Sequence, residues 1–596
     1  MHKRRLLLAL VLVLSLVLAA CTSASETQDS SEGTEPADPQ ADAPTATVED
    51  SGQYERSETL YTSGKQWGPP NNWNPLMPWQ YAMGIMNLVY ETLFVYDPIA
   101  DEYTPWIAES GDWASDTEYE LIVREGVTFT DGEPLTAEDV AFTFQLGEQY
   151  EAVWFSPLWD FLDSVEAVDD QTVRFTFTEA LYQQWANYLY DIPIVPEHIW
   201  SAFDEEQVTA GANEEPVGSG PYLYETHSED RQVYIRNDEW WGAEALGLDF
   251  APRRIVDIVN SDNNTALGLV LQGQLDLSNN FLPGVATLIG EGGGYSLSTF
   301  YEEPPYMLSA NTAWLVPNHN RPPLDDAQFR KALASAINVP EIVERVYGDI
   351  VAPANPTGLL PIWDDYVDQG VVDAHGFTYD ADEARRILAD AGYEDGDGDG
   401  MVETPDGEAI ELSVIVPNGW SDWMEAARVI ANSAQAAGIN VQADFPDFNA
   451  LVDARNAGEF DLLINNERQM SNTPWTYLRY VFREVQEPMT TDNFARYDSP
   501  EGRELLDQLD QTPVDDTAGM QQIISQMQEI QLQDTPVIPL WYNGLWAQYN
   551  DTVWSNWPAD GTENQALPAT WTGYWQLGSI NTLAELELAP PPEEEG

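Results

Sequence analysis

The chain has 596 residues, with 101 acidic against 24 basic side chains and a formal net charge of -77 at pH 7. Such a charge excludes nucleic acid and anionic lipid surfaces as electrostatic partners, and the length predicts at least two lobes instead of one core. Because the acidic excess exceeds what solubility requires, we interpret it as a halophilic adaptation, the alternative being an ordinary acidic secreted protein.

The first 21 residues have the order of a secretory signal peptide. Three basic residues at 3–5 precede an apolar run at 6–18, which is too short to span a bilayer comfortably. The run ends in "LAAC" at 18–21, which resembles the bacterial lipobox, and Cys21 is the single cysteine of the chain. We therefore predict lipid attachment at Cys21, with the exported chain held at the outer face of the cell membrane; the alternative is a chance cysteine.

Residues 22–52 are Ser, Thr, Glu, Asp, Pro and Ala with almost no large apolar side chain. A segment of this composition cannot bury enough surface to offset the entropy of ordering, so we predict a disordered tether. From about residue 53 the composition becomes globular and rich in tryptophan. Signals for strands and helices then alternate to the end, which predicts an α/β architecture.

The stretch "YELIVREGVTFTDGEPLTAEDVAFTF" at 119–144 shows the local pattern. Residues 119–123 alternate as a half-buried strand does, Gly126 interrupts them, and Val127 and Phe129 alternate again before an Asp-Gly turn. Thr136 with Asp139 three residues later predicts a capping box and a helix start. The result is strand, turn, strand and capped helix.

Two further helices are marked by their caps. Asp325 with Gln328 predicts the start of one that carries Phe329, Leu333 and Ile337 on one face. Asp380 with Glu383 predicts the start of another, which ends at Gly392. Both apolar faces are typical of ordinary core.

An acidic string, "DGDGDGMVETPD" at 395–406, has the spacing of a calcium loop. Six of its residues fall on ligand positions: Asp395, Asp397, Asp399, the Met401 carbonyl, Glu403 and Asp406. Two departures weaken the match, because the last ligand is Asp instead of a bidentate Glu and a strand-like "IELSVIV" follows instead of a helix. A structural Ca²⁺ and a solvated acidic turn are both open; no other cofactor is expected.

Several stretches in chain order resemble one family. They are "YELIVREGVTFTDGEPLTAEDVAFTF" itself, "VPEHIW" at 195–200, "VGSGPYLYE" at 217–225, "RNDEWWG" at 236–242, "GQLDL" at 273–277, "PPLDDAQFRKALASAINVPEIVERVYG" at 322–348 and "YDADEARRILADAGYEDGDGDG" at 379–400. Together they resemble the family 5 extracellular solute-binding proteins, which serve ABC importers of peptides, nickel and oligosaccharides.

This resemblance implies a two-lobed fold of the periplasmic-binding-protein type, with a hinge and a ligand cleft between the lobes. The first lobe would combine 53–303 with 545–596, and the second would span 304–544. It also implies a monomeric receptor that captures a small-molecule ligand, closes over it and delivers it to the permease subunits of an importer.

The resemblance also bears on the ligand. In peptide-binding members an aspartate pairs with the α-ammonium of the peptide, and aligning "GEFDLL" at 458–463 without gaps places Met470 at that position and Glu467 at the tryptophan of the same motif. A buried ammonium without a partner costs several kcal/mol. A peptide with a free amino terminus is therefore disfavoured unless Glu467 substitutes for the missing carboxylate.

The other branch of the family binds β-linked oligosaccharides. Sugar rings stack on indole, and their hydroxyls pair with amides and carboxylates, so a receptor for them needs Trp beside Asn and Glu. The chain has 22 Trp, several in such company. The candidate ligand-binding residues are Trp73, Asn74, Trp79, Trp420, Asn465, Asn466, Glu467, Trp475 and Trp541. For any single tryptophan among them, core packing is the alternative.

An enzyme is the remaining class. The chain contains no HExxH, GxSxG or GxxxxGK[ST] motif, and its 5 histidines are scattered without ligand spacing. A secreted glycoside hydrolase with two catalytic carboxylates stays open by motif alone. We predict a binding protein without catalytic residues, for an oligosaccharide, with an oligopeptide as the alternative ligand.

Overall fold

The computed structural model describes residues 54–64, 68–77, 82–260, 262–289, 297–466, 470–487, 489, 491–568 and 578–590. Residues 1–53, and with them the predicted signal peptide, the predicted tether and Cys21, lie outside the described residues. Within the described part, no helix is long and apolar enough to cross a membrane.

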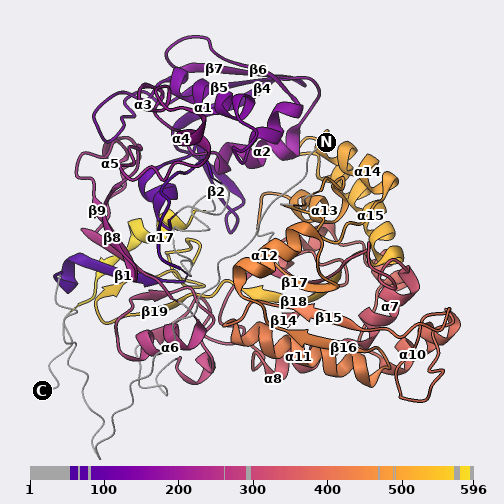
Figure 1. The fold of residues 1–596 in the computed structure, drawn as a ribbon. Helices are drawn as coiled ribbons and strands as arrows, with labels where there is room; N and C mark the ends of the chain where they lie inside the picture. The colour runs from indigo at the N-terminus through magenta and orange to yellow at the C-terminus, as the bar shows by residue number, and fades with distance from the viewer. Residues whose placement is uncertain are drawn as a thin grey trace, which may run out of the picture. The chain divides into compact units, whose positions relative to one another are not determined.

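The first large sheet of the described residues has seven strands, of which Figure 1 labels β1, β8, β9 and β19. In spatial order they are β12 (Leu297–Ser298), β19 (Gln548–Asn550), β11 (Leu277–Ser278), β1 (Thr59–Ser63), β10 (Arg254–Ile258), β9 (Arg231–Arg236) and β8 (Tyr222–Ser228). β1 pairs in parallel with β10 and β11, whereas β19 is antiparallel to both of its neighbours. A segment from near the end of the chain therefore completes a sheet begun at its start.

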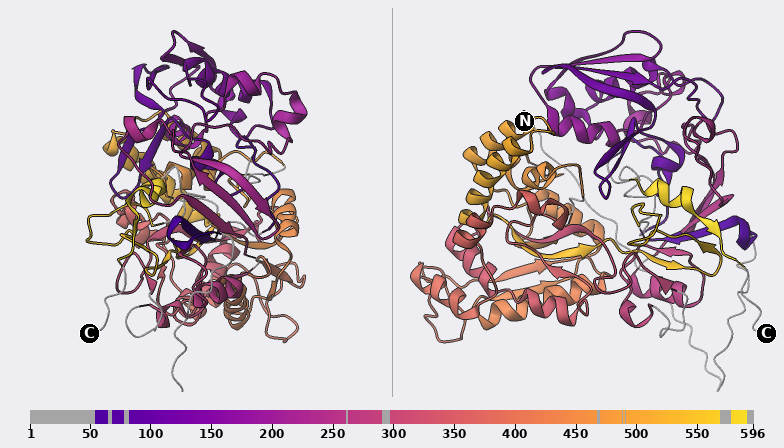
Figure 2. Two further views of the ribbon diagram at one scale, coloured as in Figure 1. Left: turned by 90° about the vertical axis from the view of Figure 1, so that its left-hand side faces the viewer. Right: turned by 180° about the vertical axis from the view of Figure 1, so that it is seen from behind.

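The second large sheet has six strands among the described residues. In spatial order they are β14 (Ala352–Pro353), β18 (Ile538–Gly544), β13 (Ser309–Pro317), β17 (Leu462–Asn465), β15 (Leu412–Ile415) and β16 (Val441–Asp444). Helices cover both of its faces (Figures 1 and 2). Alternate residues of β13 enter different cores, Ala313 and Leu315 into one and Trp314 and Val316 into the other, as the two-residue period of a strand requires.

We name these two faces by their helices. The α11 face packs against α7 (Ala327–Ala336), α8 (Val339–Arg345), α10 (Ala381–Asp390) and α11 (Ser421–Ala436). The α13 face packs against α12 (Phe448–Ala457), α13 (Trp475–Phe482), α14 (Pro500–Asp510) and α15 (Thr517–Asp534). Aromatic side chains are abundant on both faces, because each face buries a core of its own.

Smaller sheets and helices make up the rest of the described chain. A four-stranded sheet has the order β4 (Ala108–Ser115), β5 (Glu118–Val123), β7 (Thr172–Phe177) and β6 (Leu162–Ala167), and two-stranded pairs join β2 (Phe94–Asp97) with β3 (Glu102–Pro105) and β20 (Trp554–Ser555) with β21 (Glu587–Leu588). The remaining helices are α1 (Ala137–Gln149), α2 (Tyr182–Asp191), α3 (Glu197–Trp200), α4 (Glu205–Thr209), α5 (Gly242–Ala245), α6 (Asn263–Leu271), α9 (Gln369–His375) and α17 (Ser579–Glu585).

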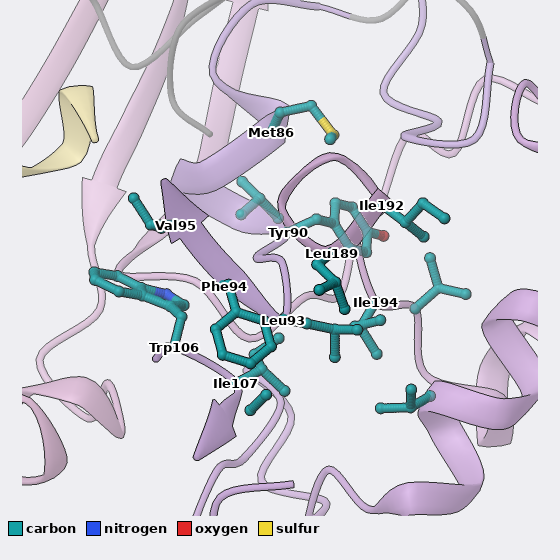
Figure 3. Close-up of a cluster of buried hydrophobic side chains, with 14 of the residues drawn as sticks. Met86, Tyr90, Leu93, Phe94, Val95, Trp106, Ile107, Leu189, Ile192 and Ile194 are labelled. Carbon is teal, nitrogen blue, oxygen red and sulfur yellow. The ribbon is translucent and has the colours of Figure 1, made fainter. Parts of the chain in front are cut away.

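A third core lies around β2 and the end of α2. Figure 3 shows Leu93, Ile107, Leu189 and Ile194 gathered in it, and all four are buried. The motif "VGSGPY" permits close approach of the backbone here. A Cβ at Gly218 would lie 1.9 Å from the Val89 carbonyl oxygen, and one at Gly220 would lie 2.3 Å from that of Leu88. Glycine is therefore required at both positions.

Most local signals read from the sequence are confirmed. Thr136 and Asp139 form the capping box of α1, and the Asp380 side chain accepts hydrogen bonds at the start of α10. One cap was assigned to the wrong residue, because Asp326 and not Asp325 caps α7. The second strand expected at 127–129 is reduced to one isolated bridge between Thr128 and Pro134, since the Asp131-Gly132 turn leaves no length for a longer ladder.

Candidate functional site

The candidate site includes Trp420, which lies at the end of the second sheet, in the loop between β15 and α11. It is the N-cap residue of α11 and is partly exposed. Its ring centroid lies 5.0 Å from that of Trp423 and 6.0 Å from that of Phe448, with an interplanar angle of 30° to the latter. Phe448 is 49% exposed. The two rings present an accessible aromatic surface of the kind that sugar rings stack on.

Trp541, another predicted ligand residue, lies on β18 beneath this region and is fully buried. Its Nε1 donates to Asn543 Oδ1 at 3.3 Å, and its ring lies 6.5 Å from Trp423 and 5.4 Å from Tyr347. Trp541 therefore packs against the aromatic side chains of this region. Its indole N–H also fixes the orientation of the Asn543 amide.

The two asparagines that end and follow β17 point to different sides. Asn465 Oδ1 accepts from the Tyr480 hydroxyl at 3.0 Å, on the α13 face. Asn466 Nδ2 donates to Asn311 Oδ1 at 3.1 Å, on β13. Strand alternation separates two residues that are adjacent in sequence, so Asn466 joins the side of Asn543 whereas Asn465 does not.

Trp475 and Met470 belong to the core of the α13 face, with 4% and 5% exposure. The Arg479 guanidinium lies 5.1 Å from the centroid of the Trp475 ring, and within the described part of the chain the Trp475 Nε1 has no hydrogen-bond partner. Trp475 is thus on the opposite face of the sheet from Trp420 and Trp541. Glu467 and Trp79, also predicted ligand residues, lie outside the described residues.

Trp73 and Asn74 lie apart from the second sheet, next to α4 and β8. Trp73 is 1% exposed, with the rings of Tyr224 and His227 at 5.1 and 4.6 Å. Asn74 is fully buried, and its Nδ2 donates to the carbonyls of Val208 and Gly211. Both side chains therefore make structural contacts within the protein, Trp73 with rings of β8 and Asn74 with the backbone at α4.

A buried polar contact joins α6 to the start of α11. Asp422 accepts from the Tyr347 hydroxyl at 3.1 Å and from Asn263 Nδ2 at 3.0 Å. Burial raises the pKa of Asp422 to about 6. Beside it, the Tyr347 ring stacks on Trp546 at 6.0 Å, and Asn279 Nδ2 donates to the Trp546 carbonyl. The segment after β18 is therefore held by an amide from the end of β11.

The acidic loop at 395–406 is separate from this region. Carboxylate oxygens of Asp395, Asp397 and Glu403 all lie within 4.8 Å of one another, and among the described residues they form the one group with such spacing. Asp399 accepts from the Met401 backbone N–H at 2.8 Å. Asp399 and Asp406 lie outside this group, and Asp406 is exposed. Three of the five predicted carboxylate ligands are thus brought together, and Met401, predicted to bind through its backbone carbonyl, is partly exposed.

The structure also places three residues at the site that the sequence alone did not single out: Asn311, Asn543 and Phe448. Asn543 is two residues from the predicted Trp541, in "LWYNGLW" at 540–546, whereas Asn311 and Phe448 carried no composition signal. Strand register places Asn311 and Asn543 at this end of the second sheet, and the start of α12 places Phe448 there.

Comparison with known proteins decides the family. The model of the bacterial extracellular solute-binding proteins, family 5 Middle, matches residues 102–487, which is more than half of the chain. The chain belongs to this family. A crystal structure of the oligopeptide ABC transporter periplasmic oligopeptide-binding protein of Thermotoga maritima, with mannohexaose bound, is 44% identical with a TM-score of 0.85, and the match covers 90% of this chain and 99% of that one.

Two curated relatives match over shorter stretches. Protein XP55 of Streptomyces lividans is 30% identical over 54% of this chain, and the oligopeptide-binding protein AppA of Bacillus subtilis is 25% identical over 58% of it. The chain spans 55% and 61% of the lengths of these two proteins. The solute-binding fold expected from the sequence, two-lobed and α/β, is confirmed by the structural matches.

Proposed function

We propose that the chain is the substrate-binding protein of an ABC importer and that it captures a neutral, β-linked oligosaccharide for delivery to the permease. The observation that carries this proposal is the likeness to the Thermotoga maritima protein, which is 44% identical over 90% of this chain and was crystallised with mannohexaose. That level of identity over nearly the whole chain makes a shared ligand class the simplest inference. No catalytic residue is part of the proposal.

The side chains at this end of the second sheet favour a neutral ligand. Met470, which stands where the resemblance to peptide receptors places the amine-binding aspartate, is buried in an apolar core and offers no charge. Trp420 and Phe448 offer stacking surface, and Asn466 and Asn543 offer uncharged hydrogen-bonding groups. A cationic amino terminus would lack an oppositely charged partner among these groups. Sugar hydroxyls, in contrast, would find both donors and acceptors in the amides.

The peptide alternative rests on relatives such as AppA, whose name describes oligopeptide binding. It also requires Glu467, which lies outside the described residues, to receive the amine. We therefore keep it as the competing outcome of the binding test.

We further propose that the receptor acts as a monomer, anchored through a lipid on Cys21 at the outer face of the cell membrane, in a saline environment. The lipobox-like "LAAC" supports the lipid anchor, and the net charge of -77 supports the saline environment. A structural Ca²⁺ in the 395–406 loop is proposed on the grouping of Asp395, Asp397 and Glu403.

The binding test is calorimetry on the purified chain in molar KCl. Mannohexaose and cellohexaose are titrated beside a pool of tri- to pentapeptides. We expect heat from the oligosaccharides, with an affinity that changes little between 0.5 and 3 M salt because no ion pair contributes. Heat from the peptides alone, weakened by Glu467→Gln, would show that the ligand is a peptide.

A further inference from the structure

Three asparagines form a row across adjacent strands of the second sheet. Asn311 on β13 is the register partner of Asn543 on β18. On the other side of β13, Asn311 Oδ1 accepts from Nδ2 of Asn466, the residue after β17, at 3.1 Å. Residues from three distant parts of the sequence therefore lie side by side, Asn311 and Asn543 through strand register and Asn466 through its side-chain hydrogen bond.

The row lies on the α11 face, at one end of the sheet. Asn311 alternates with Ala313 and Leu315, which enter that core, and Asn543 accepts from Trp541 of the same core. β13 runs antiparallel to β17 and β18, so its start meets their carboxyl ends. The register is irregular just before Asn311, between Ser309 and Asn311, and again between Ala313 and Trp314. Bulges of this kind re-aim side chains at the ends of sheets.

Asn311 and Asn543 each have one side-chain hydrogen-bonding group already engaged and another that is not. Within the described residues, Asn311 Oδ1 is bound by Asn466 and Asn543 Oδ1 by Trp541, but Nδ2 of Asn311 and Nδ2 of Asn543 donate to no described atom. Neither Nδ2 is among the fully enclosed polar atoms without a partner, although both residues are at least nine-tenths buried. Each Nδ2 therefore keeps some exposed surface, while the oxygen of the same amide is held by a neighbouring side chain.

We infer that this row, Asn311, Asn466 and Asn543, binds the hydroxyl groups of one sugar unit of the ligand, an inference that rests on the proposed function. An amide offers both donors and an acceptor without charge, which matches hydroxyls that do both. Fixed donors lose little entropy when the ligand arrives. The Trp420 and Phe448 rings, which belong to the same end of the sheet, stack on a neighbouring unit.

The row selects neutral polyhydroxyl ligands over charged ones. No carboxylate or guanidinium is hydrogen-bonded to the three amides within the described residues, in a chain where 101 side chains are acidic. A uronic acid or an amino terminus would have to give up hydration here without gaining an opposite charge. We therefore expect discrimination against charged analogues of the same length.

The test is calorimetry with mannohexaose on Asn311→Ala and Asn543→Ala in the full chain. Loss of a fixed donor to a ligand hydroxyl is expected to weaken binding about tenfold in each variant. Asn311→Ala is the primary variant, because Asn543→Ala also removes the acceptor of the buried Trp541 indole. Asn320→Ala is the matched control, since Asn320 is an exposed asparagine beyond the opposite end of β13.

Each outcome separates the row from the proposed function. If the wild-type chain binds the oligosaccharide and both variants bind it with affinities within twofold of the wild type, the inference about the row is wrong but the proposed function stands. An equal loss in Asn320→Ala also overturns it, because the effect would then not be local. A wild-type chain that binds no oligosaccharide overturns the proposed function and the row together. A tenfold loss in Asn311→Ala, with an unchanged melting temperature of the ligand-free protein, supports both.

Discussion

The Asp510 carboxylate accepts a hydrogen bond of 2.9 Å from the backbone N–H of Gln184, so the end of α14 caps the start of α2 from 326 residues away. α2 has no cap of its own, because its N-cap residue is Leu181. Gln183 strengthens the junction: its Nε2 donates to the Thr512 carbonyl and its Oε1 accepts from Thr473, both at 2.7 Å. Elements far apart in the chain are therefore coupled at one helix end.

Replacing Asp510 by Ala should lower the free energy of unfolding by about 1 kcal/mol, the usual value of an N-cap. Asp510→Asn should retain most of the stability, since an amide oxygen accepts the same bond. Asp507→Ala, one turn earlier on the exposed side of α14, is the control. Chemical denaturation measures all three. Equal midpoints for the Asp510 and Asp507 alanine variants would show that the cap contributes nothing.

Glu91 makes stability depend on pH. It is fully buried, and its carboxylate accepts from the indoles of Trp106, Trp240 and Trp241 at 2.8, 3.2 and 2.9 Å. Burial raises its pKa to about 7. A carboxyl group with a folded pKa above its ordinary value favours the fold most below about 4.5, and this contribution is lost as pH rises through about 7.

Glu91→Gln should therefore flatten the fall in melting temperature between pH 5 and pH 8. Buried Asp257 and Asp422, with pKa values raised to about 7 and about 6, contribute to the slope in both proteins, so the difference between them isolates Glu91. Glu91→Gln should also lower the free energy of unfolding at pH 5 by about 1 to 3 kcal/mol, because the amide cannot accept hydrogen bonds from all three indoles. Parallel curves for the two proteins would contradict this assignment.

If the 395–406 loop holds Ca²⁺, a chelator should lower the melting temperature of the wild-type chain. Removing a carboxylate from the three-residue group, as in Asp397→Ala, should abolish that difference. Asp406→Ala should keep it, because Asp406 lies outside the group. Calcium at 100 times its dissociation constant adds about 2.7 kcal/mol. Identical wild-type melting curves with and without chelator would leave a solvated acidic turn.

The melting temperature should rise steeply with salt. At a net charge of -77 the folded chain repels itself, and the screening length falls from about 10 Å at 0.1 M to about 3 Å at 1 M. Differential scanning fluorimetry in KCl from 0.1 to 3 M measures the effect. A flat profile would mean that the acidic surface is not an adaptation to salt.

The anchor is tested in the native host membrane. Cys21→Ala should abolish incorporation of labelled fatty acid and release the protein from the membrane fraction, because the thiol is the attachment point. Cys21→Ser controls for side-chain size. Retention of the alanine variant in washed membranes would argue for another mode of attachment.

Local features of the fold could be predicted because a few neighbouring residues determine them. Thr136 and Asp139 cap α1 through bonds within one turn, and Asp380 does the same for α10. The choice between Asp325 and Asp326 could not be made, since two adjacent acids suit the same cap and only the direction of the incoming chain decides between them.

The candidate site could be predicted only as a set of residue types. The sequence shows tryptophans next to asparagines, but it does not tell which face of a strand or helix end each of them occupies. Trp420 is partly exposed, whereas Trp475 and Trp541 are buried on opposite faces. Asn311 and Asn543 meet through register between strands more than two hundred residues apart, which no local pattern encodes.

The place of β19 in the first sheet has a consequence for synthesis. β19 lies between β11 and β12, yet it is made only when residues 548–550 have emerged. Until then the edges of β11 and β12 have no partner, whereas every strand of the second sheet is already present. The second sheet can therefore form first, and a nascent chain stalled before Gln548 would expose open strand edges to chaperones and proteases.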